Sequence, residues 1–180
     1  MEALYLHEGA PGHHFQISLA QENEALPSFM RFGGNTAFVE GWALYAETLW
    51  DELGMETDPY QRFGGLNADM YRAMRLVVDT GIHAKGWTRE QAIAYMLENG
   101  GLSETQVTGE VERYIANPGQ ALAYKIGQLK ILELRGRAEQ ALGDRFDLRE
   151  FHAQVLNTGA LPLVVLERKI DDWIASRRSI

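Results

Sequence analysis

Side chains that bind metal ions are concentrated near the start of the sequence. The segment HEGAPGHHFQ contains Glu8 and three of the chain's five histidines, His7, His13 and His14. In the HExxH pattern of zinc peptidases, two histidines one helical turn apart bind zinc, and the glutamate activates a bound water. This segment opens with the same His-Glu pair, but Pro11 stands where the pattern has its second histidine.

The spacing of these histidines suits a metal site only if the helix is interrupted. On an unbroken helix, His13 would lie about 9 Å and His14 about 10.5 Å along the axis from His7, whereas each ligand nitrogen must come within about 2.1 Å of zinc. Pro11 disrupts the hydrogen bonding of a helix, and Gly12 allows unusual backbone angles. We therefore expect a bulge that brings His13 or His14 beside His7. The alternative is a set of ordinary surface or core histidines near a helix break.

A third ligand is expected from the stretch AFVEGWALYAE, because a zinc site of this kind needs three protein ligands. Glu40 lies there among bulky apolar neighbours, and a buried carboxylate is costly unless it is paired or metal-bound. Glu47 lies on nearly the same helical face, and we interpret it as a solvated residue. That interpretation is also the alternative for Glu40. The chain has no cysteine, so any metal must be bound by His, Asp or Glu.

Length and composition indicate one globular domain. The 180 residues suffice for a hydrophobic core, and 46% of them are hydrophobic. A net charge of −8 argues against nucleic acid as a partner, because phosphate binding requires a basic face. No apolar run approaches the roughly 20 residues that span a bilayer. The chain opens directly in a helical pattern and without a signal peptide, so we expect the C-terminal part of a longer protein; its compartment is not predicted.

The apolar spacing predicts a single all-α domain over residues 1–180. No stretch shows the apolar–polar alternation of a strand between hairpin turns. Three start signals are a Pro at the first helical position after Asp58 and two capping boxes, Thr88 with Gln91 and Ser103 with Gln106. After the initial segment, helices are expected over residues 36–53, 59–85, 88–99, 103–117 and 118–143, from residue 147, and over 161–176.

Four motifs resemble those of a widespread bacterial family, domain of unknown function 885. In chain order they are LHEGAPGHHFQ, FVEGWALYAE, RLVVDTGIHAKGW and NPGQALAYKIGQLKILELR. They cover most of the chain, and together they are highly specific. The family is grouped with the zincin metallopeptidases, and its members are much longer. The resemblance implies that this chain is the helical catalytic part of such a metallopeptidase.

The resemblance also implies a gluzincin arrangement, with two histidines from one helix and a glutamate from a second. By that analogy, His7, His13 and Glu40 would bind zinc, and Glu8 would be the general base. Dipeptidyl peptidase III, with its lengthened HExxxH motif, is a precedent for one inserted residue. Here two residues are inserted, so His14 remains an alternative second ligand. Glu40 in FVEGW matches the second-helix glutamate of thimet-type oligopeptidases and of thermostable bacterial carboxypeptidases.

The late motif ALAYKIGQ is similar to the segment of those carboxypeptidases in which a tyrosine lies near the scissile carbonyl. Tyr124 would then donate a hydrogen bond to the developing oxyanion, a contribution that can reach about 3 kcal/mol of the barrier. The alternative is a core tyrosine at helical spacing with Leu122 and Ile126.

Other polar residues favour structural interpretations. Asp79 and His83 share a helical face and could orient a metal ligand. Arg72 and Arg75 on the same helix could bind a peptide carboxylate. We favour a structural network of ion pairs for these four residues. His152 lies in an ordinary amphipathic stretch, and we interpret it as structural.

The sequence therefore predicts a zinc-dependent peptidase that cleaves peptide substrates through a metal-activated water, with one zinc ion or another divalent metal as cofactor. The alternative is a non-catalytic helical binding or scaffold module with a degenerate metal site. A chain that binds metal but is inactive on its own is a third outcome. We also expect self-association through apolar surface that the rest of a longer chain would otherwise cover.

Overall fold

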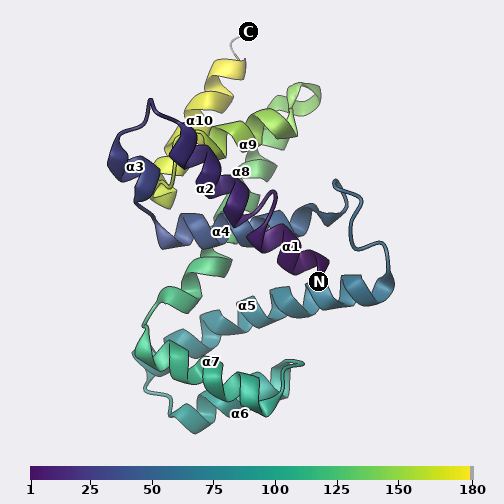
Figure 1. Cartoon of the computed structure of the whole chain (residues 1–180), viewed down its shortest axis with the longest axis vertical. Coiled ribbons are helices and arrows are strands. Elements are labelled where there is room, and N and C mark those ends of the chain that lie inside the picture. Colours follow the sequence, from purple (N-terminus) through teal and green to yellow (C-terminus); the bar gives the residue numbers. More distant parts are fainter. Residues whose placement is uncertain (179–180) are drawn as a thin grey trace.

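α-Helices form the regular structure of the computed structural model, which describes residues 1–178 (Figure 1). No strand occurs in this range, so the all-α prediction is confirmed. Nor does any helix within it have the length and apolar character needed to cross a membrane. The elements are α1 (Glu2–Glu8), α2 (His13–Glu22), α3 (Ser28–Phe32), α4 (Thr36–Glu47), η1 (Thr48–Trp50), α5 (Pro59–Lys85), α6 (Arg89–Asn99), α7 (Glu104–Ala116), α8 (Gln120–Leu142), η2 (Gly143–Arg145), α9 (Leu148–Leu156) and α10 (Leu163–Arg178).

The predicted start signals are present as side-chain caps. Asp58 accepts hydrogen bonds from the first backbone N–H groups of α5. Thr88 with Gln91, and Ser103 with Gln106, each exchange both hydrogen bonds of a capping box at the starts of α6 and α7. The caps bind backbone N–H groups of the first helical turn, which have no partner within the helix. Because capping residues lie next to the helix start in the sequence, the sequence predicted these starts correctly. In contrast, α4 ends at Glu47 rather than at the predicted residue 53, and the 3₁₀ turn η1 follows it.

The expected bulge at the proline is a complete break between α1 and α2. The loop contains a cis Ala10–Pro11 peptide, and the backbone at Gly12 is not helical, with a ψ of −140°. Gly12 presses against the end of α1: a Cβ atom there would lie 1.9 Å from the carbonyl oxygen of His7. Trp42 on α4 donates a hydrogen bond of 2.8 Å to the Pro11 carbonyl oxygen. The loop is thereby held between α1 and α4.

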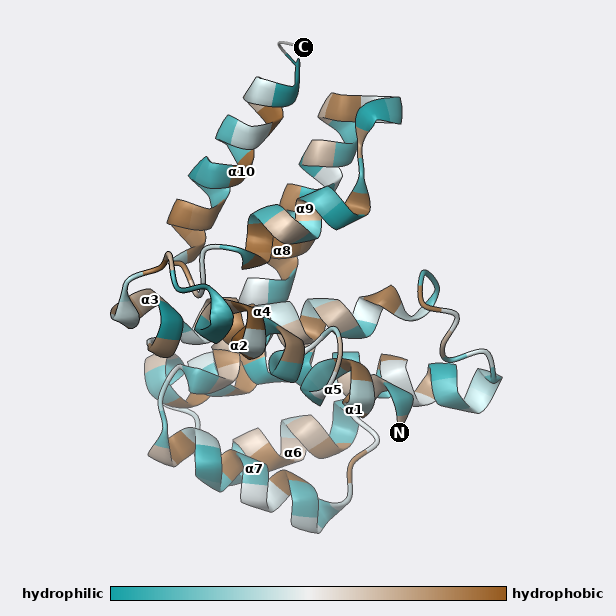
Figure 2. Ribbon diagram, turned by 45° about the horizontal axis from the view of Figure 1, so that its top comes forward, coloured by the Kyte–Doolittle hydropathy of each residue, from teal (hydrophilic) through white to brown (hydrophobic). Residues whose placement is uncertain are grey.

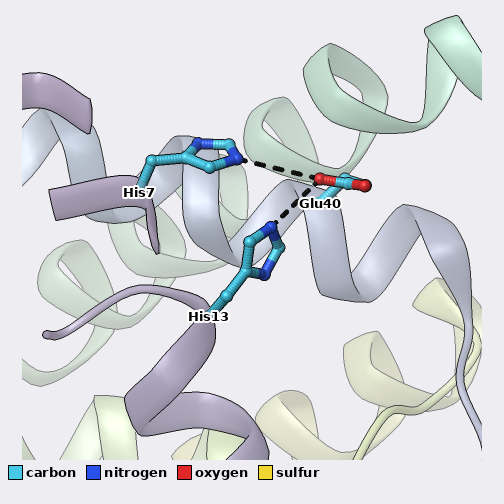
Figure 3. Close-up of side chains that lie close together, drawn as sticks. All are labelled: His7, His13 and Glu40. Atoms are coloured by element: carbon cyan, nitrogen blue, oxygen red, sulfur yellow. Dashed lines mark hydrogen bonds and ion pairs between the residues drawn. The ribbon is translucent and has the colours of Figure 1, made fainter. Parts of the chain in front are cut away.

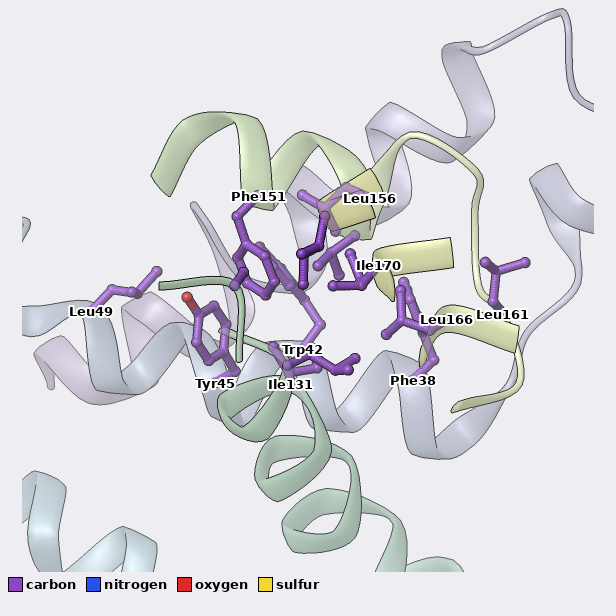
Figure 4. Close-up of a cluster of buried hydrophobic side chains, with 14 of the residues drawn as sticks. Phe38, Trp42, Tyr45, Leu49, Ile131, Phe151, Leu156, Leu161, Leu166 and Ile170 are labelled. Atoms are coloured by element: carbon purple, nitrogen blue, oxygen red, sulfur yellow. The ribbon is translucent and has the colours of Figure 1, made fainter. Parts of the chain in front are cut away.

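Apolar side chains form two buried clusters that share α8. Hydrophobic and hydrophilic residues alternate along the helices, as the ribbon coloured by hydropathy shows (Figure 2). The first cluster packs Phe38, Trp42 and Tyr45 of α4 against α8, α9 and α10 (Figure 4). The second packs α5, α6 and α7 around the start of α8, where Ala121 is fully buried. Helix α8 therefore runs from one cluster into the other and crosses α4 between them.

The crossing of α4 and α8 is a backbone-to-backbone contact made possible by two glycines. A Cβ atom on Gly41 would lie 2.4 Å from the Cα atom of Gly127, and one on Gly127 would lie 1.9 Å from the carbonyl oxygen of Ala37. Side chains at either glycine would push the helices apart. Glu40 adjoins Gly41 on α4, and Tyr124 lies one turn before Gly127 on α8. The crossing therefore sets the distance between Glu40 and Tyr124.

Candidate metal centre

Three side chains from three helices converge beside the α1–α2 break (Figure 3). His7 lies at the end of α1, His13 in the first turn of α2, and Glu40 on α4. One candidate ligand atom from each residue lies within 4.8 Å of the other two. The Glu40 carboxylate oxygen Oε2 lies 3.2 Å from His13 Nε2 and 3.8 Å from His7 Nε2. The break between α1 and α2 therefore brings His13 beside His7, which an unbroken helix would not allow.

The two nitrogen–oxygen separations in this group are close to those of a zinc site, and the three ligand atoms lie within 4.8 Å of one another. Ligand atoms bound tetrahedrally at about 2.1 Å from zinc lie about 3.4 Å apart. The two nitrogen–oxygen separations, 3.2 and 3.8 Å, lie on either side of that value. Two imidazoles and one carboxylate form a donor set that zinc commonly uses in catalytic sites, where a fourth position is left for water.

Glu47 fixes the orientation of His7, which corrects its interpretation as a solvated residue. His7 is 3% exposed, and its Nδ1 lies 2.6 Å from Glu47 Oε1. An ionised carboxylate can only accept, so His7 Nδ1 carries a proton and donates a hydrogen bond to it; in the neutral form of the ring, the lone pair is then on Nε2. A carboxylate behind a histidine ligand is a recurring arrangement in metal sites, because it sets both the tautomer and the ring orientation.

The electrostatics of His13 and Glu40 reflect their contact. Burial alone lowers the pKa of His13, but the hydrogen bond and charge of Glu40 outweigh it, and the pKa is raised above its usual value. Burial alone raises the pKa of Glu40, but the hydrogen bond and charge of His13 outweigh it, and the pKa is lowered. Each group thus favours the charged form of the other. The side chain of Gln16, one turn later on α2, contributes a further hydrogen bond that raises the pKa of His13.

Glu8 and His14 both have exposed side chains. Glu8 is the last residue of α1, directly after His7, and its charge contributes to the raised pKa of His13. His14 does not belong to the cluster found among residues 1–178. Of the two candidate second ligands, the structure brings His13 beside His7.

Tyr124 on α8 lies at the centre rather than in a core away from it. Its ring stacks on the His7 imidazole, with centroids 6.2 Å apart and planes inclined by 15°. Its hydroxyl also contributes a hydrogen bond that lowers the pKa of Glu40. Gln120, one turn earlier on α8, donates to the Tyr124 hydroxyl at 3.4 Å. The phenol is therefore held beside the proposed ligands with a hydroxyl that can donate.

Arg75 supports Tyr124 from the α5 side. Its guanidinium carbon lies 4.5 Å from the centre of the Tyr124 ring. Its Nε donates to the Tyr114 hydroxyl at 3.0 Å, and Nη2 donates to the Tyr71 hydroxyl at 2.7 Å and to Glu110 at 3.3 Å. These bonds agree with the structural interpretation of Arg75. Its partners Tyr71, Tyr114 and Glu110 were not considered from the sequence.

The family model described as "Bacterial protein of unknown function (DUF885)" matches residues 1–170. The chain belongs to the DUF885 family. The resemblance inferred from the four motifs is thus confirmed at family level. Among curated proteins, none matches the chain.

Two solved structures share the fold of this DUF885 chain. A candidate lipoprotein from Colwellia psychrerythraea is 52% identical, with a TM-score of 0.95 over 98% of this chain and 30% of that chain. A candidate lipoprotein of unknown function from Shewanella oneidensis is 30% identical, with a TM-score of 0.84 over 93% of this chain and 30% of that chain. The chain therefore spans about a third of the length of these relatives.

Outside the centre, Asp79 and His83 of this DUF885 chain bind backbone groups of other segments, so the pair that could have oriented a metal ligand does not form. Both carboxylate oxygens of Asp79 accept from the backbone N–H of Gly119, at 3.2 and 3.0 Å, and hold the start of α8. His83 Nε2 lies 3.0 Å from the Tyr114 carbonyl oxygen. The guanidinium carbon of Arg72 lies 5.7 Å from the Tyr124 ring centre, so Arg72 also borders the centre.

His152 packs within the first apolar cluster, which agrees with its structural interpretation. Its Nε2 lies 2.7 Å from the Tyr45 hydroxyl, and its ring meets the Trp42 ring edge to face at 5.4 Å. Burial, helped by the charge of Arg135, lowers its pKa to about 4. His152 is therefore neutral at pH 7 and accepts the tyrosine hydrogen bond.

Sequence reasoning missed Glu47 and the tyrosines that bind Arg75. A signal for Glu47 was present, because residues seven apart lie on nearly the same helical face and Glu40 was already a candidate. Tyr71 lies four residues before Arg75 on α5, so helical spacing carried a signal for that partner. Tyr114 comes from α7, and no local pattern in the sequence relates the two helices.

Proposed function

We propose that this chain carries a zinc-dependent peptidase site of the gluzincin type, with His7, His13 and Glu40 as the metal ligands. The proposal adds an activity to the family assignment, since neither the DUF885 family nor the two similar structures are described with one. It is supported by the geometry of the three side chains and by the surroundings of His7.

The orientation of His7 is the observation that carries the proposal. Because His7 Nδ1 donates a hydrogen bond to Glu47, the neutral form of the ring directs the lone pair of Nε2 toward the Glu40 carboxylate, 3.8 Å away. Two electron-rich atoms facing each other in a largely buried place repel unless a positive charge lies between them. A divalent cation that binds both atoms, and His13 Nε2 as well, satisfies all three donors at once.

The proposed chemistry gives each of the chain's groups one role. When bound, zinc lowers the pKa of a coordinated water toward neutrality and polarises the scissile carbonyl. The Glu8 carboxylate accepts the proton of the attacking water and passes it to the nitrogen of the leaving amine. The Tyr124 hydroxyl donates a hydrogen bond to the carbonyl oxygen as negative charge develops there. Glu47 keeps the Nδ1 proton of His7 in place throughout.

Metal analysis of protein purified without a histidine tag tests the ligand assignment. We expect about one zinc ion per chain, and we expect His7→Ala to abolish zinc binding. His14→Ala is the matched control, because His14 is exposed and lies outside the cluster. Zinc that stays bound to the His7→Ala protein, or no zinc in the parent protein, would refute the ligand set and favour the scaffold alternative.

The Glu8→Gln variant tests the general base separately from the metal. We expect it to bind zinc as the parent does, and to hydrolyse a library of short peptides at least about 100-fold more slowly, because general-base catalysis contributes at least that much. Release of amino groups measures the activity. A Glu8→Gln protein as active as the parent would remove Glu8 from the mechanism. If the parent binds zinc but hydrolyses none of the peptides, the chain alone lacks activity.

A further inference from the structure

Arg72 lies beside the candidate metal centre without an acidic partner. It is half-buried on α5, yet its guanidinium group takes part in no hydrogen bond or ion pair within residues 1–178. Asp and Glu outnumber Lys and Arg by 25 to 17 in this chain, so carboxylates are not scarce. Three residues later on the same helix, Arg75 is bound by two tyrosine hydroxyls and a glutamate. Arg72 therefore lies outside the network of ion pairs predicted for this helix.

The surroundings of Arg72 leave one edge of its guanidinium group available. The guanidinium carbon lies 5.1 Å from the ring centre of Tyr71 and 5.7 Å from that of Tyr124. Nε is the only one of its three nitrogens that is both enclosed and unpaired, so the unpaired Nη1 and Nη2 remain open to a ligand. Contact with aromatic rings uses the faces of the group, whereas its N–H groups point outward in its plane. This edge suits the two oxygens of a carboxylate.

The distance from Arg72 to the centre matches the end of a short peptide. The Tyr124 ring centre lies 6.2 Å from the His7 ring centre and 5.7 Å from the Arg72 guanidinium carbon, so that carbon is at most about 12 Å from the His7 ring. An extended peptide advances about 3.3–3.6 Å per residue, and a charged hydrogen bond adds about 2.8 Å. One or two residues therefore fit between a carbonyl at the metal and a carboxylate at Arg72.

We infer that Arg72 binds the C-terminal carboxylate of the peptide substrate, so that the centre acts as a C-terminal exopeptidase site. The inference rests on the proposed function and names the substrate class of that same site. Water adds across the scissile bond, its hydroxyl to the carbonyl carbon and its proton to the nitrogen of the released residue or dipeptide. A C-terminal amide has one acceptor oxygen and no charge, and a bond far from the C-terminus places no carboxylate at Arg72.

Binding to the metal-free protein tests this subsite without catalysis, and it prevents a carboxylate from binding zinc instead. The probes are N-acetyl-alanyl-alanine, which has a free carboxylate, and N-acetyl-alanyl-alanine amide, titrated at millimolar concentration and followed by amide NMR shifts. We expect the free acid to shift signals of α5 around Arg72 and to bind at least about tenfold more tightly, because hydrogen bonds between charged groups are the strong ones. Equal binding of the two probes, or no binding of the free acid, would overturn the inference.

Two variants and a control assign the preference to Arg72. Arg72→Gln should remove the preference for the free acid, because the new side chain carries no charge. Arg72→Lys keeps the charge but not the planar fork, so it should retain part of the preference. Arg168→Gln, at an exposed arginine of α10, is the matched control and should leave it unchanged. Thermal unfolding checks that each variant folds. A folded Arg72→Gln protein that still prefers the free acid, or an equal loss in Arg168→Gln, would overturn the inference.

Hydrolysis by the zinc-loaded protein separates this inference from the proposed function. If peptides are cleaved, mass spectrometry should find single residues or dipeptides released from the C-terminus, and C-terminal amides should have a lower kcat/KM than free acids. Arg72→Gln should remove that difference. Equal loss of kcat/KM for acids and amides would place Arg72 in support of Tyr124 and overturn the subsite. If the free acid binds as expected but the zinc-loaded protein cleaves no peptide, the carboxylate subsite stands and the proposed peptidase function fails.

Discussion

Two carboxylates on one helix have different surroundings at this centre. Glu40 faces both histidine Nε2 atoms, whereas Glu47, two turns later on α4, contacts only the far nitrogen of His7. The first can bind a cation directly, and the second determines which histidine atom is free to do so. Both side chains are largely buried, so their charges act in surroundings that strengthen electrostatic interactions.

Removing the carboxylate of Glu47 should weaken metal binding without removing a ligand. Loss of such a partner commonly lowers metal affinity 10- to 100-fold, so we expect Glu47→Leu to weaken zinc binding by about that factor. Glu47→Gln keeps an acceptor for the Nδ1 proton but loses the charge, so it should be intermediate. Competition with a chromophoric chelator measures the affinities, and exposed Glu98→Leu is the control. An unchanged affinity in Glu47→Leu would contradict the role given to Glu47.

At this scale, the sequence predicted residue types better than contacts. His7, His13 and Glu40 were named from their spacing, from their neighbours and from the family resemblance, and the structure brings them together. The choice between His13 and His14 depends on the backbone at Gly12, and the contact of Glu47 depends on how α1 packs against α4. The choice of His13 and the contact of Glu47 both depend on tertiary packing, which the periodicity of the sequence does not predict.

At the scale of elements, two close backbone contacts position the centre. Gly12 lets the loop between α1 and α2 press against the end of α1, and Gly41 with Gly127 lets α4 and α8 touch. The first contact places His13 beside His7, and the second places Tyr124 near Glu40. Capped helix starts such as those of α6 and α7 are encoded locally. The α4–α8 contact joins segments far apart in sequence, and at Gly12 the sequence predicts an interruption of the helix but not the contact that follows from it.

Gly127→Ala tests the α4–α8 contact. Its Cβ atom would meet the Ala37 carbonyl oxygen at 1.9 Å, so the helices must separate, and we expect a loss of about 1–3 kcal/mol in the free energy of unfolding. The control lies on the same helix: nothing lies within 4 Å of a Cβ atom at Gly136, so Gly136→Ala should stabilise the protein by about 0.5–1 kcal/mol. Urea unfolding measures both changes. Equal effects of the two substitutions would show that α4 and α8 do not touch at this point.

At the scale of the whole molecule, the candidate centre lies where two cores meet. The apolar cluster of α4, α9 and α10 is on one side and that of α5, α6 and α7 on the other, with α8 in both. Ligand sites often form at such junctions, because the two bodies supply side chains from different directions. Large apolar side chains such as Phe29, Phe32 and Phe63 are more than half exposed, and self-association through such surface stays a prediction.

The stability of the whole fold should depend on His152 in mildly acidic solution. In the folded chain its pKa is lowered to about 4, because the ring is buried beside the charge of Arg135, whereas in the unfolded chain it is about 6.5. Between these values the unfolded state binds the extra proton, so the contribution of His152 to stability is complete above pH 6.5 and is lost as the pH falls toward 4. The slope is at most about 1.4 kcal/mol per pH unit, and it is reduced because the ring is partly exposed.

His13 and several carboxylates titrate in neighbouring ranges, so the measurement must isolate His152. In His152→Gln, the side-chain carbonyl can still accept from the Tyr45 hydroxyl but does not titrate. Urea unfolding of both proteins at pH 7.5, 6.0 and 5.0 gives the difference in free energy of unfolding, in which the shared groups cancel. We expect the parent to lose stability relative to the variant as the pH falls. A difference that is constant, or that grows in favour of the parent, would mean that His152 is not held neutral in the core.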